Sequence, residues 1–256
     1  MTNIEIKILE PDTYLSARRL MVTAARLTQR NHAIHSLDDL VAMHERPASD
    51  DLVATLSGLP HPTLQKLGTI TIAIVGASRR FLAQITRHQN EVKFMSGSLQ
   101  YSDMSGASSF VMPYAMLADA QAADDYLREC RRAAKAYEDL IAGGADHDSA
   151  GYLMPQGMRN TLLICATPYQ WKHMISQRVC RRNTDETRVI MLRVWSLLRQ
   201  LDPIVFSGIG PGCMTSHCPE GKMWCGARLT KDASPDDILR EDYPLLYERY
   251  DVYPMK

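Results

Sequence analysis

The chain has 256 residues, 45% of them hydrophobic, and its 29 basic side chains are balanced by 29 acidic ones. This length can bury a sizeable core, and the zero net charge removes a general attraction to nucleic acid or to an anionic membrane, so neither is expected as a partner. No apolar run is long enough to span a membrane and the first residues lack a signal-peptide core, so we expect a cytoplasmic protein whose six cysteines are reduced or bind a metal.

Three segments have the residue pattern of β-strands. Residues 4–11 alternate apolar and polar side chains. Residues 66–77, KLGTITIAIVGA, carry isoleucines at a period of two, and we expect this strand to end at Gly76. Residues 158–167, MRNTLLICAT, are a third predicted strand because their centre is an apolar run of strand length.

Helical periodicity covers much of the remaining sequence. The predicted helices begin near Ser, Asp or Pro residues that favour a helix start, and Asp12 is expected to cap the first of them. They comprise residues 13–28, 36–46, 49–60, 79–88, 122–144, 168–180 and 185–202. Residues 103–118 are predicted to be an irregular connection. Strands and helices in this order indicate one helix-rich α/β domain.

The segment RHQNEVKFMSGSLQYS, residues 87–102, concentrates side chains that donate hydrogen bonds. It is too polar for a buried strand, so we interpret it as a loop that either binds a ligand or is merely solvated. The preceding helix favours a ligand, because Gln84, Arg87 and His88 share one of its faces and project together toward the loop. Ser98 lacks the Gly-x-Ser-x-Gly elbow of a nucleophile, so its surroundings alone predict a hydrogen-bonding group.

Arginines are frequent in the C-terminal half of the chain. They include Arg159, Arg178, Arg181, Arg182 and Arg188. A guanidinium group is a planar fork that suits phosphate or carboxylate, so the cluster indicates an anion site. The alternative from spacing alone is a solvated connection between two helices, in which these charges pair with Asp185 and Glu186.

The tail segment CMTSHCPEGKMWC is a candidate metal site. Its four soft ligands lie within thirteen residues and are Cys213, His217, Cys218 and Cys225. Zinc takes about four such ligands in a tetrahedral arrangement, although this spacing is not that of a standard zinc finger. The alternative is a structured tail with three reduced cysteines. Two other cysteines, Cys130 and Cys165, are expected in the core because of their apolar neighbours.

The loop at residues 87–102 resembles the signature of flavin-dependent thymidylate synthases, which is roughly R-H-R, a variable stretch, and S-x-R-Y. Arg87 and His88 match its beginning. Ser98 and Tyr101 match its end when one extra residue is admitted between them.

Three further segments resemble the same family in the order that the family requires. AARLT at residues 24–28 is similar to an early A-A-R-V-S element, and LPHPTLQ at residues 59–65 is similar to an H-x-T element. RVCRRNTDETR at residues 178–188 is similar to R-x(4)-A-Q-x-E-I-R, with both arginines and the glutamate at the expected intervals. The resemblance spans roughly residues 14–201.

The resemblance implies a fold and an activity. The fold would be a single helix-rich α/β (α+β) domain with a mostly antiparallel central sheet, like that of thymidylate synthase-complementing proteins, assembled as a homotetramer with active sites between subunits. Residues 1–205 would bind flavin and nucleotide, and residues 206–256 would be a Cys-containing tail packed on the same domain. The activity would be C5 methylation of dUMP to dTMP, with FAD as cofactor and with NADPH and methylenetetrahydrofolate as co-substrates.

The family also implies roles for individual residues. Arg188 would contact the uracil and favour its ionisation at N3, and Ser98 would be the second catalytic residue. The nucleotide and its phosphate would be held by Gln84, Arg87, Ser98, Leu99, Gln100, Arg159 and Arg188. FAD would be held by Thr63, Arg87, His88, Gln89, Ser176, Gln177, Arg178 and Arg182.

Several positions depart from the family pattern. Gln89 and Gln100 replace arginines, and Lys66 and Ser96 replace glutamates. An Arg-to-Gln change removes a charge-assisted partner of phosphate. Two alternatives therefore stay open. One is a related flavin-dependent enzyme that acts on another uridine nucleotide or gives a hydroxymethyl product, and the other is a non-enzymatic nucleotide-binding protein with a zinc-binding tail.

Overall fold

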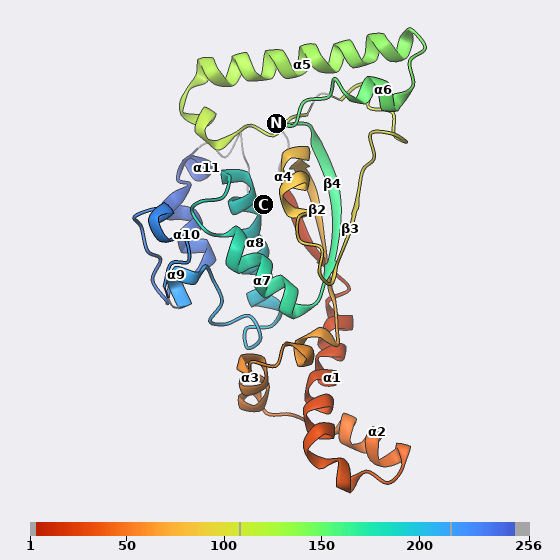
Figure 1. The fold of residues 1–256 in the computed structure, drawn as a ribbon. Coiled ribbons are helices and arrows are strands. Elements are labelled where there is room, and N and C mark those ends of the chain that lie inside the picture. Colours follow the sequence, from red (N-terminus) through yellow and green to blue (C-terminus); the bar gives the residue numbers. More distant parts are fainter. Residues whose placement is uncertain (1–3, 108, 216, 249–256) are drawn as a thin grey trace.

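Four strands form an antiparallel sheet in the order β1-β2-β4-β3 (Figure 1). They are β1 (Glu5–Leu9), β2 (Ile70–Ser78), β3 (Val92–Ser96) and β4 (Arg159–Ala166). The computed structural model describes residues 4–107, 109–215 and 217–248. The two central strands, β2 and β4, are those with the longest apolar runs in the sequence, and the predicted single helix-rich domain with an antiparallel sheet is confirmed.

The helices cover one face of this sheet and extend beyond it. The α-helices are α1 (Pro11–Arg30), α2 (Leu37–Glu45), α3 (Asp50–Gly58), α4 (Arg79–Ile85), α5 (Ala120–Ala142), α6 (His147–Gly151), α7 (Pro168–Arg178), α8 (Asp185–Leu201), α9 (Gly212–Thr215), α10 (Pro235–Asp242) and α11 (Leu245–Glu248). The short 3₁₀ helices are η1 (Asn31–Ala33), η2 (Pro62–Lys66), η3 (Tyr114–Ala118) and η4 (Gly221–Met223).

One predicted helix start and one predicted helix end are wrong. Helix α1 begins after Glu10, which occupies the capping position, so Asp12 lies inside the first turn and does not cap it. Helix α4 stops at Ile85, so Arg87 and His88 follow the helix instead of sharing a face of it. The backbone therefore turns at this point, and these two side chains are placed by the turn and not by helical periodicity.

The sheet buries one face and leaves the other open. On β2, Ile70, Ile72 and Ile74 are at most 1% exposed, whereas Val75 on the opposite face is 39% exposed. The same alternation continues on β4, where Leu163 is 40% exposed between two buried neighbours. Figure 1 shows α4, α7 and α8 on one side of the sheet. The isoleucine period that predicted the strand therefore also identifies the face that these helices cover.

Strand β2 passes Gly76 instead of ending there, which corrects the prediction. A bulge lies between Val75 and Ala77, and Gly76 within it has φ of 90°. Such a positive φ is favourable for glycine and costly for other residues. The bulge lets the strand continue to Ser78, whose hydroxyl accepts a hydrogen bond from the backbone N–H of Phe81 at 3.0 Å and caps α4 as the sequence predicts.

The segment predicted as one continuous loop contains strand β3. Residues Val92–Ser96 pair with β4, and β4 is the neighbour of β3 in the sheet order. Because β3 is at the edge of the sheet, Lys93, Met95 and Ser96 face solvent, and only Val92 is buried. An edge strand tolerates polar side chains, which is why the polarity of this segment conceals a strand.

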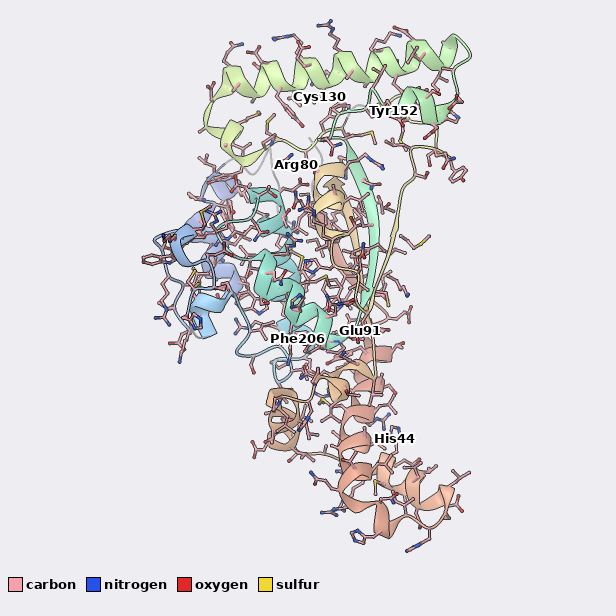
Figure 2. The ribbon with its side chains drawn as sticks, viewed as in Figure 1. His44, Arg80, Glu91, Cys130, Tyr152 and Phe206 are labelled. Carbon is pink, nitrogen blue, oxygen red and sulfur yellow. The ribbon has the colours of Figure 1, made fainter. Side chains whose placement is uncertain are left out.

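A second, smaller core lies beneath α5 and α6. It contains Cys130 and Tyr137 of α5 together with Phe110, Met154 and Met158. Figure 2 labels Cys130 on the inner side of α5. The prediction that Cys130 is a core residue is confirmed. Cys165 is only partly buried on β4, so the same prediction for that residue is wrong.

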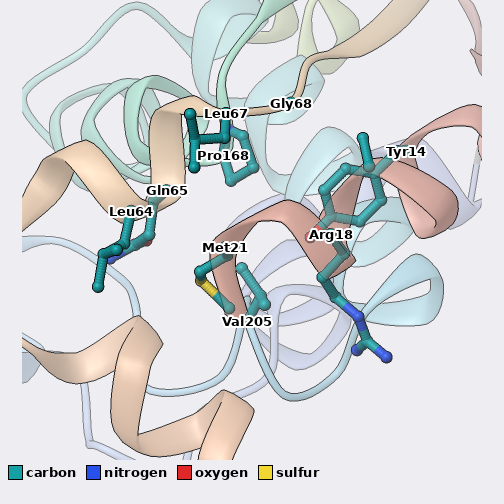
Figure 3. Close-up of a pocket in the computed structure, with 10 residues that line it drawn as sticks. Tyr14, Arg18, Met21, Leu64, Gln65, Leu67, Gly68, Pro168 and Val205 are labelled. Atoms are coloured by element: carbon teal, nitrogen blue, oxygen red, sulfur yellow. The ribbon is translucent and has the colours of Figure 1, made fainter. Parts of the chain in front are cut away.

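Helix α1 is fixed to the domain through a buried carboxylate. Asp202 is 1% exposed and accepts hydrogen bonds from the Tyr14 hydroxyl at 2.9 Å and from Arg18 at 3.1 Å. The nearby cavity shown in Figure 3 lies among side chains that include Met21 and Val205 and has a volume of about 20 Å³. This space is close to that of a single water, so it is a packing gap and not a ligand site.

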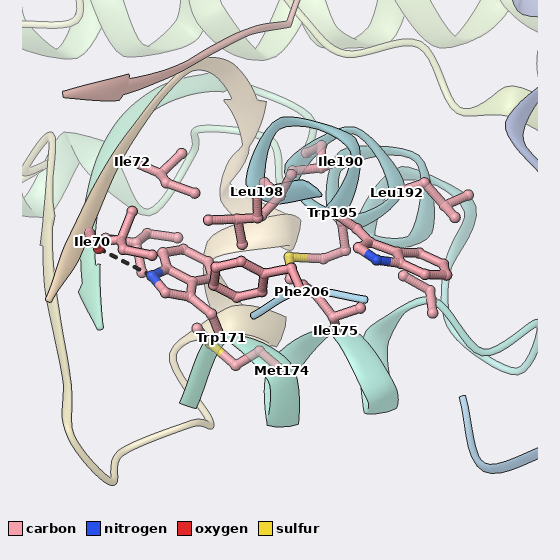
Figure 4. Packing of buried hydrophobic residues seen from close by; sticks show 14 of the residues in the cluster. Ile70, Ile72, Trp171, Met174, Ile175, Ile190, Leu192, Trp195, Leu198 and Phe206 are labelled. Carbon is pink, nitrogen blue, oxygen red and sulfur yellow. Dashed lines mark hydrogen bonds between the residues drawn. The ribbon is translucent and has the colours of Figure 1, made fainter. Parts of the chain in front are cut away.

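The main core packs α7 and α8 against the sheet (Figure 4). Trp171 of α7 is completely buried and its indole N–H donates to the carbonyl of Ile70 at 3.0 Å. Leu198 of α8 and Phe206 lie beside it, and Trp195 of α8 lies farther along the same core. Burying aromatic residues of this size provides a large share of the hydrophobic stabilisation, and the bonded indole leaves no polar cost at Trp171.

The chain after α8 returns to pack on that helix. Ile238 and Leu239 of α10 are buried, and Asp236 accepts a hydrogen bond from Ser196 of α8 at 2.9 Å. Tyr243, just after α10, meets the ring of Tyr114 edge-on at a centroid distance of 4.9 Å. Within the described residues no helix is long and apolar enough to cross a membrane.

Candidate functional site

Arg178, at the end of α7, connects two of the segments that resemble the family, residues 178–188 and residues 87–102. Its Nε donates to Nε2 of His88 at 2.8 Å, and its Nη2 donates to the carbonyl of Gln84 at 2.9 Å. Its Nη1 donates to Asn183 at 3.3 Å. The exposed Arg87 lies close enough for its charge to lower the pKa of Arg178, after the larger effect of burial. The structure therefore brings together residues that are some ninety positions apart in the sequence.

His88 is buried at this junction and is neutral. It is 6% exposed, and its ring lies edge-on to His173 at a centroid distance of 5.8 Å. Burial, followed by the charges of Arg178 and His173, lowers the pKa of His88 to about 4. Because a guanidinium can only donate, Nε2 of His88 accepts and the ring proton resides on Nδ1. His88 thus orients Arg178 and does not supply a positive charge.

A cleft of about 760 Å³ opens beside Arg178. One wall carries polar side chains from the end of α7 and the turn after it, and the other consists of the glycine- and cysteine-containing chain after α8. Arg182 approaches Glu220 across the cleft, at 3.8 Å. The lining includes Ser176, Gln177, Arg178, Arg182, Asn183, Gly210, Pro211, Gly212, Cys213, Cys218 and Glu220. Its volume lies in the range of small-molecule and cofactor sites.

The cleft has the donors that a dinucleotide cofactor requires. Two guanidinium groups, Arg178 and Arg182, can bind a pyrophosphate, and the side chains of Ser176 and Gln177 add a hydroxyl and an amide. Four of the residues for which the sequence implies an FAD role therefore lie on one surface. His88 is joined to this surface through its bond to Arg178.

A second hollow of about 500 Å³ lies at the start of β3. It contains Gln89, Glu91 and Lys66, and its other side carries Tyr169 and His173 of α7. Lys66 pairs with Glu91 at 2.6 Å and lies over the ring of Tyr169 at 5.1 Å from the centroid. The predicted flavin residue Thr63 is exposed on η2, the same short helix that ends at Lys66.

Ser98 lies at the other end of β3, away from Gln89. Its Oγ accepts hydrogen bonds from the backbone N–H groups of Gln100 at 3.1 Å and of Tyr101 at 3.3 Å, so it holds a turn. Strand β3 spans five residues, roughly 17 Å at ~3.3 Å per residue. Figure 2 shows Glu91 at the opposite end of the sheet from Arg80, and the preceding Arg79 donates to the carbonyl of Gly97, next to Ser98, at 3.2 Å.

The residues around Ser98 form a separate group with Arg159. The N–H of Gly97 donates to the carbonyl of Thr161 at 3.2 Å, next to Arg159 at the start of β4. Leu99 packs on the small core beneath α5, and Gln100 is exposed. One chain thus places these predicted nucleotide residues in two groups. Gln84 and Arg87 lie at the end of α4, whereas Ser98 to Gln100 and Arg159 lie beyond the far end of β3.

The predicted catalytic Arg188 is buried, with 3% of the residue exposed. Its Nε donates to the carbonyl of Val179 at 2.8 Å, its Nη2 pairs with the carboxylate of Asp242, and the ring of Tyr243 lies 5.4 Å from its guanidinium carbon. Asp242 also pairs with Arg181 at 2.8 Å. Asp242 and Tyr243 were not foreseen, because no local pattern relates α10 to α8.

The alternative pairing of the arginines with Asp185 and Glu186 is wrong in its detail. Asp185 accepts a hydrogen bond from the Tyr243 hydroxyl at 3.2 Å. Glu186 accepts from the backbone N–H of Ser78 at 2.7 Å and from the Ser78 hydroxyl, and burial raises its pKa. Glu186 therefore ties α8 to the end of β2 and is not the partner of Arg178 or Arg188.

The predicted zinc ligands in the tail are not gathered around one point. Among the described residues, which include all four of these positions, no three His, Cys, Asp or Glu side chains already form a group that could hold a metal ion. The backbone turns sharply here, since a Cβ on Gly212 would lie 3.2 Å from the carbonyl oxygen of His217. Cys213 and Cys218 line the 760 Å³ cleft, whereas His217 does not.

Comparison with known proteins identifies the family. The family described as thymidylate synthase complementing protein matches residues 12–204. The chain belongs to this family. The resemblance seen in the signature segments is thereby confirmed, as is the prediction of a flavin-dependent thymidylate synthase-like enzyme at the level of the family.

Several relatives cover most of the chain. The flavin-dependent thymidylate synthase of Geobacter sulfurreducens is 26% identical over 219 residues, which are 85% of this chain and 91% of that protein. The enzyme of the same name from Pyrococcus abyssi is 25% identical over 190 residues, covering 70% of this chain and 78% of that protein. The residues after position 204 lie outside the match to the thymidylate synthase complementing protein family.

A solved structure has the same fold. The UMP/dUMP methylase PolB from Streptomyces cacaoi, crystallised with 5-Br dUMP, superimposes with a TM-score of 0.62. The superposition covers 80% of this chain and 94% of that one at 14% sequence identity. This likeness confirms the predicted fold class.

Proposed function

We propose that this chain catalyses the flavin-dependent C5 methylation of a pyrimidine nucleotide, with dUMP as the substrate and dTMP as the product. The single observation that carries the proposal is the 760 Å³ cleft in which Ser176, Gln177, Arg178 and Arg182 meet, all at positions of the family pattern. Relatives that cover most of the chain are named flavin-dependent thymidylate synthases.

The cleft is the proposed FAD site. The guanidinium groups of Arg178 and Arg182 would bind the pyrophosphate, and His88 would keep Arg178 in place through the 2.8 Å hydrogen bond. Bound FAD would accept hydride from NADPH and transfer it during the methylation, for which methylenetetrahydrofolate supplies the carbon. The side chains of the chain itself bind and orient the reactants and exclude water from the cleft.

The nucleotide site is proposed to form between subunits. Arg159 and Ser98 lie beyond one end of β3, whereas Gln89 precedes its other end and Arg87 and Gln84 belong to the turn and helix before it. A single compact nucleotide cannot contact both groups across a strand of roughly 17 Å. A homotetramer would solve this problem, because one subunit would supply the first group and its neighbour the second.

Arg188 has a conditional role in this proposal. Its guanidinium is now held by Asp242, Val179 and Tyr243. For Arg188 to contact a uracil, the chain segment that carries Asp242 and Tyr243 must move from its present position. A cation placed at the ring would then favour ionisation at N3.

The proposal is tested by the visible spectrum of the purified protein after addition of FAD. We expect a bound flavin whose absorbance decreases on anaerobic addition of NADPH, and we expect dUMP to accelerate this reduction. UMP is the matched comparison, because Gln100 replaces an arginine of the family pattern and the substrate pocket thus differs in charge. A protein that binds no flavin at any FAD concentration would show the proposal to be wrong.

The assignment of the cleft is tested by Arg182→Ala. Among the residues that the structure describes, Arg182 forms one ion pair, at 3.8 Å to Glu220, so its removal leaves the fold nearly unchanged. We expect FAD to dissociate at least about tenfold more readily, since a charged hydrogen bond contributes about 1.5–3 kcal/mol. Arg132→Ala on the exposed side of α5 is the control and should retain FAD as the wild type does. Equal affinities of the two variants would exclude this cleft as the flavin site.

A further inference from the structure

Four cysteines from separate parts of the chain line one small cavity behind the flavin cleft. Cys180 follows α7, Cys213 lies in α9, Cys218 follows α9, and Cys225 follows η4. The cavity has a volume of about 10 Å³, close to the space that a single water occupies. A cavity of this size admits one small ion and excludes any organic ligand.

Contacts around Cys180 show that the thiols are neighbours. The groups that act electrostatically on Cys180 include Glu220, Cys225 and Cys213, all of which border the same cavity.

The chain around this cavity has few other means of holding its shape. Residues 217–228 contain no buried residue, and η4 is their only helical segment in the described structure. Two backbone carbonyls of the region are held by arginines, since Arg181 donates to Ala227 at 3.0 Å and Arg228 donates to Cys213 at 2.7 Å. A segment without an apolar core commonly needs a metal or a disulfide to fold, and all six cysteines are free thiols here.

We propose that Cys180, Cys213, Cys218 and Cys225 bind one structural zinc ion in this cavity. Four thiolates complete a tetrahedral shell without an open position, which is the arrangement of structural and not catalytic zinc. The four sulfur atoms are not gathered in the structure, and the exposed Cys225 donates its thiol proton to the carbonyl of Ala227. Zinc binding therefore requires these side chains to rotate toward a common centre, at about 2.3 Å from the ion. Arg181 and Arg182 also line the cavity, where they are paired with Asp242 and Glu220.

This set differs from the one that the tail sequence suggests. His217 is absent from the cavity lining, and Cys180 takes its place from a position more than thirty residues earlier in the chain. Cys180, Cys213 and Cys218 also line the 760 Å³ cleft. The ion would therefore fix the wall of the cleft formed by the chain after α8. The proposal does not depend on the reaction proposed above.

Metal analysis of the intact protein tests the proposal. The protein is produced without a metal-binding tag in zinc-supplemented medium, and zinc is measured by mass spectrometry. We expect about one zinc ion per chain in the wild type and loss of most of it in Cys180→Ser and Cys225→Ser. His217→Ala and Cys130→Ser are the matched controls and should keep their zinc. X-ray absorption of the wild type should show four sulfur neighbours at about 2.3 Å and no nitrogen neighbour.

Two outcomes would overturn the proposal. One is a wild type that contains no zinc and takes up none after reduction and addition of zinc ions. The other is zinc that survives Cys180→Ser but is lost in His217→Ala, which would restore the ligand set in the tail. Because a cysteine variant can fail to fold, the wild type is also treated with a chelator. Removal of zinc should make residues 205–248 sensitive to proteolysis, whether or not the protein binds flavin.

Discussion

At the scale of single residues, the hollow beside His173 differs in its charged side chains from the family pattern. The family pattern has an arginine where this chain has Gln89 and a glutamate where it has Lys66. Both side chains line the same hollow of about 500 Å³, and Lys66 is paired there with Glu91 at 2.6 Å. Glu91 therefore neutralises the charge of Lys66, and an anion would have to displace Glu91 to bind Lys66.

The environment of His88 predicts a dependence of stability on pH. Its pKa is lowered to about 4 from an ordinary value of 6.5. Between these values the unfolded chain binds a proton that the folded chain does not, so stability decreases as the pH falls from 6.5 to 4. From pH 6.5 to pH 4, we expect the free energy of unfolding of the wild type to fall by on the order of 3 kcal/mol more than that of His88→Gln. Urea unfolding measures this difference.

The control for this prediction is His32→Gln, because His32 is exposed on η1. It should follow the pH dependence of the wild type. If His88→Gln also follows the wild type, the folded protein accommodates a protonated His88 and the neutral tautomer assigned here is incorrect.

At the scale of the elements, local periodicity predicts the helices and strands that bury one defined face. It fails for an edge strand, for a bulge and for contacts between distant segments. Strand β2 and helix α8 are evident from their apolar spacing because each buries a defined face. Strand β3 is missed because an edge strand exposes most of its side chains, and the bulge at Gly76 is missed because glycine also ends strands. The contact between Arg188 and Tyr243 joins positions 55 residues apart, which no local pattern reports.

The candidate site also has a part that the sequence predicts and a part that it does not. The sequence groups Ser176, Gln177 and Arg178 correctly because they follow one another on α7. It does not reveal that Ser98 is separated from Gln89 by a strand. Neither does it reveal that Cys180 shares a cavity with Cys225, since both facts depend on how distant segments pack.

The attachment of α10 to α8 yields a prediction for Asp242→Ala. This change removes the carboxylate that pairs with Arg188, whose side chain is 3% exposed, and with Arg181 at 2.8 Å. Removing one partner of a buried ion pair costs about 3–5 kcal/mol, and we expect the free energy of unfolding at pH 7 to decrease by about 3 kcal/mol. Chemical unfolding followed by circular dichroism measures it.

The pH dependence and a neighbouring acid provide the controls. Burial raises the pKa of Asp242, but hydrogen bonds from Arg181 and Arg188 outweigh that effect and lower it overall. The stabilisation is therefore present above the ordinary carboxyl pKa and is lost as the pH falls through the lowered value. Glu241 is 73% exposed and 3.7 Å from Arg181, so Glu241→Ala should change stability by only about 0.5 kcal/mol. Equal losses in both variants would contradict the role given to Asp242.

At the scale of the whole molecule, the open face of the sheet is a surface suited to a second copy of the chain. Met95 of β3 lies opposite Leu163 of β4, and Leu163 lies opposite Ala73 of β2. Met95 is 70% exposed and Leu163 is 40% exposed, so apolar side chains run across three strands without cover in one chain. A subunit placed there would lie next to the end of β3 that carries Ser98, where the proposed nucleotide site needs residues from a neighbour.

This arrangement predicts that Met95→Glu disrupts the oligomer but not the fold. Met95 makes little contact within its own chain, so thermal unfolding at low protein concentration should be close to that of the wild type. Light scattering should show a tetramer for the wild type and a smaller species for the variant, because a charge facing an apolar partner surface is costly to bury. Met223→Glu, at a methionine that is 56% exposed on η4, is the matched control and should remain a tetramer. A Met95→Glu protein that remains a tetramer would place the subunit contact on another surface, and the nucleotide site would then have to draw its second group of residues from a different neighbour.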